Sequence, residues 1–333
     1  MSAYAAFDGP VAGTSRERLL NALKSSAPIF LVLFGLLTWI AIIQPSFLEP
    51  QVFLAYLKRS APLAILAAGQ YFVIVAAGFD LSVGSLVTVT VVVAARLIEG
   101  DPAKTWPVVA LLLALGATVG LVNGLITTRL HVPSFITTLG MLLILEGAVF
   151  LWTDGAPQGA LSEEFRTVGR EGIEGFPVLE TLPYSVILFV AVGVAGVLAM
   201  RSNFGRKLLA VGDNDRAAAL SGVPVQRMRT IAFVLSGLSA AVAGILLGGF
   251  AGVSAQVGQG LEFEAITAVV LGGVALGGGR GSIAAAIAGA LALEALFTLL
   301  NLQGVSGALE DAVQGSIIIA AVAYAAYRTR GTR

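Results

Sequence analysis

Residues 203–230 read NFGRKLLAVGDNDRAAALSGVPVQRMRT, a long polar insert in a chain that is otherwise dominated by apolar runs. Asp213 and Asn214 are residue types that cap the start of a helix, and residues 217–220 favour helix strongly. Gly222, followed closely by Pro224, is a typical helix end. The stretch therefore predicts a short helix of about two turns that stands clear of the membrane between two spans.

The insert is also strongly basic. Only Asp213 and Asp215 oppose the six positive charges in or beside it, which are Arg201, Arg206, Lys207, Arg216, Arg227 and Arg229. Basic loops stay on the cytoplasmic side of a membrane. A cytoplasmic surface helix between two spans suits docking to a soluble partner, although an ordinary basic connector fits the pattern equally well.

The composition sets the class of protein. A mean hydropathy of +0.90 with 57% hydrophobic and 12% charged residues is too apolar for a soluble domain of 333 residues. The 40 glycines fall inside apolar runs, as expected for close helix packing in lipid. No cysteine and a single histidine, His131, argue against a metal centre, a cysteine nucleophile or a Ser/His hydrolase. We expect no cofactor and no nucleic-acid partner.

Ten apolar runs predict the architecture. They are 27–43, 61–77, 81–95, 106–127, 134–152, 184–200, 231–250, 265–276, 283–300 and 312–327. Several are shorter than the roughly 20 residues that a perpendicular span needs, so some helices must extend or be broken. The sequence predicts an all-α polytopic integral membrane protein of about ten transmembrane helices. The permease domain would occupy residues 27–327, between cytoplasmic segments 1–26 and 328–333.

The charges orient these spans. Ten spans place both termini on one side, and if that side is the cytoplasm, 14 of the 20 basic residues lie inside and 6 outside. The six are Lys58, Arg59, Arg96, Lys104, Arg166 and Arg170. Residues 153–183 then form an acidic external loop, folded on the surface, that could receive a basic partner or be a solvated cap. Both termini are predicted to be cytoplasmic.

Polar side chains at membrane depth are candidates for the translocation path. Such groups are expensive in lipid and usually face a bundle interior or a water-filled route. They are Gln70, Asp80, Ser82, Asn123, Glu146 and Glu294. Each has a structural alternative: the amides and glutamates can hydrogen-bond between helices, and Asp80 can cap the helix that starts near Leu81.

A second glycine break, GGGRGS at residues 277–282, interrupts the later half as GFDLSVGS at 78–85 interrupts the earlier half. Paired breaks of this kind mark discontinuous helices near a transport path. The run is not a phosphate loop, because no Gly-Lys-Ser/Thr follows. We therefore expect that the chain does not hydrolyse ATP itself.

Four stretches together resemble a known family. They are GQYFVIVAAGFDLSVGS (69–85), VPSFITTLGMLLILEG (132–147), GRKLLAVGDNDRAAALSGVPVQRMR (205–229) and AITAVVLGGVALGGGRGS (265–282). In this order they are similar to the membrane permease subunits of bacterial ABC importers for simple sugars, the ribose, xylose and galactose type, which are related to branched-chain amino acid permeases. The resemblance implies a multi-pass protein of the bacterial inner membrane. Its implied partners are cytoplasmic ABC ATPase subunits, a periplasmic sugar-binding protein, membrane lipid and a second permease, which is either a second copy in a homodimer, as we expect, or a different permease in a heterodimer.

The resemblance gives residues 201–230 the role of the loop that couples to the ATPase. Importer permeases carry an EAA-x-x-x-G pattern here; Ala217, Ala218 and Gly222 match it, whereas Arg216 stands at the glutamate position and Asp215 supplies a nearby carboxylate. The predicted coupling residues are Gly212, Asn214, Asp215, Arg216, Ala217, Ala218, Ser221 and Gly222.

The chain is thus predicted to be a transport subunit for a sugar or polyol, without a catalytic residue. A permease for branched-chain amino acids or another small polar solute is the nearest alternative. A stand-alone ion-coupled carrier that uses Asp80, Glu146 or Glu294 as a relay belongs to a second class. An intramembrane enzyme is disfavoured, because no paired catalytic constellation is present.

Overall fold

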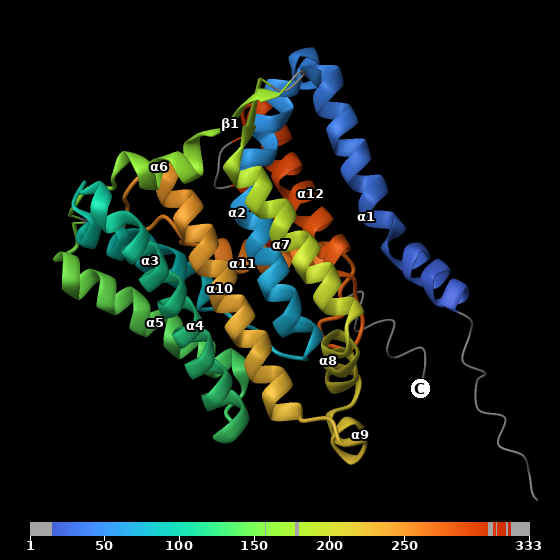
Figure 1. The fold of residues 1–333 in the computed structure, drawn as a ribbon. Coiled ribbons are helices and arrows are strands. Elements are labelled where there is room, and N and C mark those ends of the chain that lie inside the picture. The colour runs from blue at the N-terminus through green and yellow to red at the C-terminus, as the bar shows by residue number, and fades with distance from the viewer. Residues whose placement is uncertain are drawn as a thin grey trace, which may run out of the picture.

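The structure, a computed structural model, describes residues 15–156, 158–176, 180–305, 309–310, 312–317 and 319–320 (Figure 1). Helices dominate it. In chain order they are α1 (Ser15–Ile43), the 3-10 turn η1 (Pro45–Leu48), α2 (Pro50–Val75), α3 (Val83–Ile98), the 3-10 turn η2 (Pro102–Lys104), α4 (Thr105–Arg129), α5 (Ser134–Thr153), α6 (Glu163–Arg170), α7 (Tyr184–Arg201), α8 (Asn203–Asp213), α9 (Asp215–Leu220), α10 (Val225–Ala251), α11 (Leu261–Leu271) and α12 (Ile283–Leu302). Strands β1 (Gly172–Phe176) and β2 (Glu180–Pro183) pair antiparallel.

Six of the described helices are long and apolar enough to cross a membrane. They are α2, α4 together with η2 (residues 102–129), α5, α7, α10 and α12. Residues 28–43 and 83–98 form shorter apolar helices. The protein is therefore an all-α polytopic membrane protein, with one small hairpin. The number of about ten spans stays a prediction, since the run 312–327 lies only partly among the described residues, and residues 1–14 and 321–333 lie outside them.

The run predicted at 265–276 is not a full span in the structure. Its helix, α11, covers 11 residues, and the chain turns at residues 272–282 before α12 begins. Gly273, Gly278 and Gly279 adopt positive φ values there, a conformation that glycine enters without steric cost. The break predicted from GGGRGS is therefore present and starts earlier than expected.

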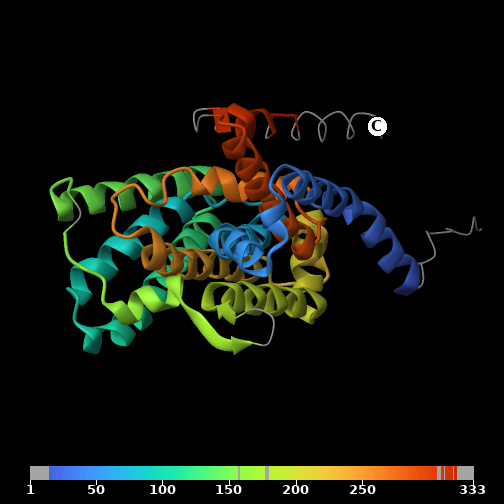
Figure 2. The same cartoon turned by 90° about the horizontal axis from the view of Figure 1, so that it is seen from above.

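Helices α2 and α10 form the centre of the bundle, whereas α5 and α7 lie at its edge, as the view in Figure 2 shows. Glycines let α4 approach α10 very closely. A Cβ atom built on Gly116 would lie 2.5 Å from the carbonyl oxygen of Gly237, and one on Gly120 would lie 2.2 Å from that of Phe233. Only residues without a side chain allow this backbone contact, as at other tight membrane helix interfaces.

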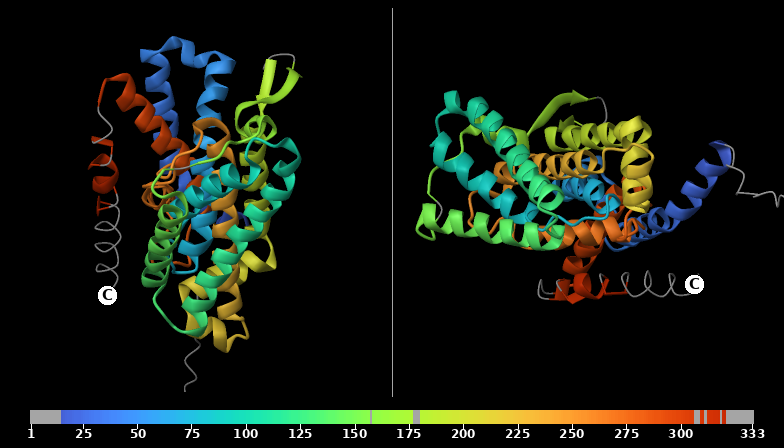
Figure 3. Two further views of the ribbon diagram at one scale, coloured as in Figure 1. Left: turned by 90° about the vertical axis from the view of Figure 1, so that its left-hand side faces the viewer. Right: turned by 90° about the horizontal axis from the view of Figure 1, so that it is seen from below.

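The connections gather at two opposite ends (Figures 1 and 3). At one end, Arg96 donates to Gln158 across 2.7 Å, and the hydroxyls of Thr105 and Ser162 lie 2.6 Å apart, so the loops around α6 and η2 pack together. At the other end lie α8 and α9. The loop predicted at 153–183 is folded, as expected, and contains α6 and the hairpin.

Candidate functional site

The predicted docking helix is α9, and its boundaries follow from local chemistry. The side chain of Asn214 accepts a hydrogen bond from the Ala217 amide across 3.0 Å, which caps the helix start. At the other end Gly222 has φ +79°, and the amide of Val223 reaches back to the carbonyl of Ala218 across 3.0 Å. The predicted helix, its cap and its glycine end are confirmed. Leu220, at the tip, is 91% exposed.

The structure corrects two points in this region. Residues 203–213 also form a helix, α8, which the sequence did not predict; Ser202 caps it, and its buried Leu208 and Val211 hold it against the bundle. Ala218 is 5% exposed and packs within the chain rather than on an outward face. The open surface of α9 is instead formed by residues 215–217, 219 and 220, which include Arg216 and Ala217.

The end of α8 is joined to two other elements through glycine backbones. A Cβ atom on Gly212 would lie within 2 Å of the Val75 carbonyl oxygen at the end of α2, and 2.5 Å from the amide nitrogen of Gly279. Gly279 itself donates to Val75 across 2.9 Å. The two glycine breaks of the sequence, near residues 78 and 279, thus meet at α8.

Arg229, near the start of α10, links α9 to the same place. Its guanidinium donates to the Ala76 carbonyl and to the Asp215 carboxylate, each across 3.3 Å. Arg229 also lines a cavity of about 260 Å³, whose wall includes His131. The side chain of Arg229 thus connects α9 to the end of α2.

Residues 76–82, between α2 and α3, hold a buried polar cluster. The Asp80 carboxylate accepts from the Ser82 hydroxyl at 2.6 Å and from the Ser82 amide at 3.0 Å. Asn123 of α4 donates to the Ser82 hydroxyl across 2.9 Å. In the orientation that pairs donors with acceptors, the Gln70 amide contacts the Asp80 backbone N–H and C=O, each across 3.2 Å. All four residues are at most 1% exposed.

Four of the six predicted path residues therefore lie together, although they come from three separate parts of the chain. Ser236 of α10 also lies beside the Asp80 carboxyl group, and the sequence analysis missed it because a serine in an apolar run carries no distinctive signal. The Asn123 Oδ1 atom is buried without a partner among the described residues. Asp80 is not the N-cap of the following helix, as its structural alternative required: α3 begins at Val83, its N-cap residue is Ser82, and the Asp80 carboxylate instead stabilises the turn before it.

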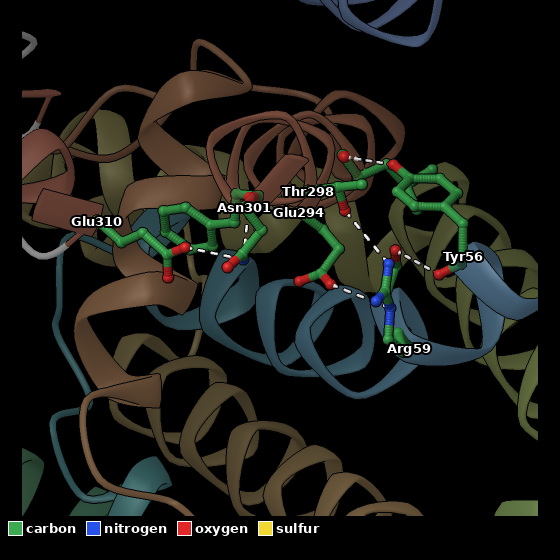
Figure 4. Close-up of polar contacts among 9 residues, drawn as sticks. Tyr56, Arg59, Glu294, Thr298, Asn301 and Glu310 are labelled. Carbon is green, nitrogen blue, oxygen red and sulfur yellow. Dashed lines mark hydrogen bonds and ion pairs between the residues drawn. The ribbon is translucent and has the colours of Figure 1, made fainter. Parts of the chain in front are cut away.

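The two glutamates lie elsewhere. Glu146 is exposed on α5, within electrostatic range of Glu262 of α11. Glu294 of α12 faces Arg59 of α2, with Nε and Oε1 3.8 Å apart (Figure 4). From the sequence, Arg59 was counted only among the basic residues predicted to lie outside. Its contact with Glu294 was not predicted, because no sequence pattern indicates that α2 packs beside α12.

Comparison with known proteins gives the family. Residues 52–322 match the family described as branched-chain amino acid transport system / permease component. The chain belongs to this family. It is therefore a permease component and not an enzyme, and the resemblance seen in the sequence is confirmed at the family level.

Three curated permeases show how far this similarity extends. The chain is 36% identical to the ribose import permease of Bacillus subtilis over 299 residues, 88% of this chain and 90% of the relative. It is 37% identical to that of Escherichia coli K12 over 297 residues, 87% and 91% of the two chains. It is 36% identical to the E. coli L-arabinose permease over 273 residues, which are 81% of this chain and 80% of the relative. No solved structure matches the chain.

Proposed function

We propose that this permease component forms the membrane path of an ABC importer for a simple sugar, with pentoses as the first candidates. The observation that carries the proposal is the similarity, over most of the chain, to permeases named for ribose and L-arabinose. The description of the family names branched-chain amino acids, which are the second candidate substrate.

The proposed partners are cytoplasmic ABC ATPase subunits and a periplasmic sugar-binding protein. The support for the first is α9, a short helix that presents the exposed Leu220, Arg216 and Ala217 and directly follows α8, whose end packs against α2 and the turn at 277–282. Dimerisation of the ATPases would move α9 and so bias the bundle between its inward and outward states.

A second copy of the chain is proposed to complete the path. Glu146 supports this proposal, because it lies on the exposed apolar face of α5, one helical turn from the exposed Leu143 and Phe150. A carboxylate in the middle of a lipid-facing surface is expensive. A neighbouring permease over α5 would take Glu146 out of lipid.

The proposed topology has about ten spans with α8, α9 and both termini in the cytoplasm of the bacterial inner membrane. The charge distribution supports it: the basic residues predicted to be external include Lys104 of η2 and Arg166 and Arg170 of α6, and Arg96 and Lys58 contact the same region. Figure 1 shows α6 at the end of the bundle opposite α9. The buried Gln70–Asp80–Ser82–Asn123 cluster is proposed as the polar part of the path, because it occupies the break between two helices.

The test is uptake by cells that express the chain with an ABC ATPase and a binding protein encoded beside it. We expect accumulation of labelled D-ribose or L-arabinose, lost when the ATPase is inactivated. Labelled leucine is the control substrate. Leucine uptake without sugar uptake would assign the second candidate substrate, and sugar uptake that survives loss of the ATPase would contradict the ABC mechanism.

A further inference from the structure

A cavity of about 550 Å³ opens at the end of the bundle away from α9. It is bounded by η1, by the first third of α2, by the last turns of α12, and by Phe250 near the end of α10. Its volume falls within the roughly 300–1,000 Å³ typical of small-molecule sites. It is separate from the buried polar cluster, which lies at the opposite end of α2.

The walls combine aromatic surfaces with polar groups. Phe47, Tyr56 and Phe297 provide the aromatic part, and the Phe47 and Tyr56 rings pack edge to face with centroids 5.7 Å apart. The Tyr56 hydroxyl donates to the Leu291 carbonyl across 2.5 Å, which holds α2 to α12 and keeps the ring in place. The aromatic wall is thus preformed.

The polar groups come from two facing helices: Arg59 from α2, and Glu294, Thr298 and Asn301 from α12 (Figure 4). Arg59 reaches the Thr298 hydroxyl across 3.3 Å and faces Glu294, while the Asn301 amide donates to Glu310 across 2.9 Å. The Arg59 and Glu294 side chains are 57% and 22% exposed, so both retain donors and acceptors for a ligand. Cations and carboxylates occur together, which disfavours a strongly charged ligand of either sign.

We propose that this cavity binds one monosaccharide on its way to the buried cluster. A sugar has hydroxyl groups that pair with carboxylate, guanidinium and amide groups, and apolar C–H faces that pack on aromatic rings. A mixed wall of this kind recognises both. This assignment rests on the proposed function. It goes further by identifying the cavity as the site where the sugar first contacts the membrane subunit. Glu294 and Asn301 are its hydrogen-bonding residues.

The test uses the absence of cysteine from the chain. Ala55 lines the cavity and is exposed, so Ala55→Cys creates a single reporter there without removing a polar contact. Ala103→Cys is the matched control, since Ala103 is exposed on η2 and does not line the cavity. In membrane vesicles that hold the complete transporter, a charged thiol reagent should modify both cysteines.

D-Ribose, L-arabinose, D-xylose and D-galactose are then added in turn, and uptake of each is measured in the same vesicles. We expect a transported sugar to slow modification of Ala55→Cys about tenfold at about ten times its dissociation constant, because the fraction of empty sites is 1/(1 + [L]/Kd). Modification of Ala103→Cys should not change. Adding Glu294→Gln to the Ala55→Cys chain should remove the protection.

Three results would overturn the proposal. The first is modification of Ala55→Cys at one rate whether or not a transported sugar is present, which leaves the proposed function standing. The second is a cysteine at 55 that never reacts with the charged reagent, as in a cavity closed by lipid. The third is absence of both sugar protection and sugar uptake, which would reject the proposed function as well.

Discussion

The backbone nitrogen of Gly279 lies 2.9 Å from the carbonyl oxygen of Val75, so the turn before α12 is hydrogen-bonded to the last residue of α2. Gly212 of α8 closes on the same pair of atoms. Three elements far apart in the sequence thus meet through their backbones, beside the helix that we propose as the ATPase contact. Motion of α8 would move α2 and the turn together, because no flexible side chain separates them, whereas α9 reaches the end of α2 through the side chain of Arg229.

Gly212→Ala should destabilise the protein. Its Cβ would overlap the Val75 carbonyl and the Gly279 amide, and overpacking of this kind costs about 1–3 kcal/mol. The readout is the temperature at which the detergent-solubilised chain aggregates. Gly277→Ala is the matched control, since nothing lies within 4 Å of a Cβ atom there. Equal loss of stability in the two variants would show that the close contact at Gly212 is unimportant.

Gly222→Val should weaken binding of the ATPase. A β-branched residue resists φ +79°, at a cost of about 1–3 kcal/mol, and the cost is conformational because a Cβ atom would meet nothing within 4 Å. Gly222→Asn should be milder, since asparagine tolerates this conformation. The measurement is the amount of ATPase recovered with tagged permease at matched membrane expression, together with sugar uptake. Full recovery and uptake with Gly222→Val would make the loop a mere connector.

Arg229→Ala should uncouple transport from ATP hydrolysis while ATPase binding persists. The variant loses the link from Asp215 to the Ala76 carbonyl, although a half-exposed ion pair itself contributes only about 0.2–1 kcal/mol to stability. Arg229→Lys should uncouple partly, because an ammonium group cannot span both acceptors as the guanidinium does. The ratio of sugar imported to ATP hydrolysed reports the effect.

Arg227→Ala is the control for this series, since Arg227 is exposed on α10, two residues before Arg229, and should leave the ratio nearly unchanged. An unaltered ratio in Arg229→Ala would show that α9 transmits its motion by another route.

Asp80→Asn should be mild, and Asp80→Ala severe. Asparagine keeps the oxygen that accepts from the amide and hydroxyl of Ser82. Alanine leaves both donors buried without this acceptor, and each unsatisfied buried donor costs about 1–3 kcal/mol of stability. The readouts are membrane expression, thermal stability and uptake. Normal expression of Asp80→Asn with lost uptake would assign the charge of Asp80 to the path instead of to the turn.

Single cysteines at Ala160 and Ser221 should react from opposite sides of the membrane. Both residues are exposed, on the α6 side and beside α9 respectively. Ser162 would be a poor reporter, because it is 2% exposed and caps α6 through the Phe165 amide. An impermeant reagent outside intact cells should label only the cysteine at 160. Labelling of both would contradict the proposed topology.

The sequence by itself determined the class of protein, its charge asymmetry and the helix α9. Apolar runs in a membrane form helices, because the backbone N–H and C=O groups find no water there and must hydrogen-bond within each segment. Asn214 and Gly222 end α9 by local hydrogen bonds and local φ, which need no distant neighbour. These features depend on residues close together in the chain, so a pattern could reveal them.

Only the tertiary structure decided which polar residues meet. Gln70, Asp80 and Asn123 form one cluster because α2 and α4 both pack on α10, whereas Glu294 lies beside Arg59 because α12 packs on α2. Ala218 is buried because α9 folds back on the bundle. Helix packing sets these contacts through shape, down to single glycines such as Gly212, and hydrophobic pattern alone does not encode which face meets which.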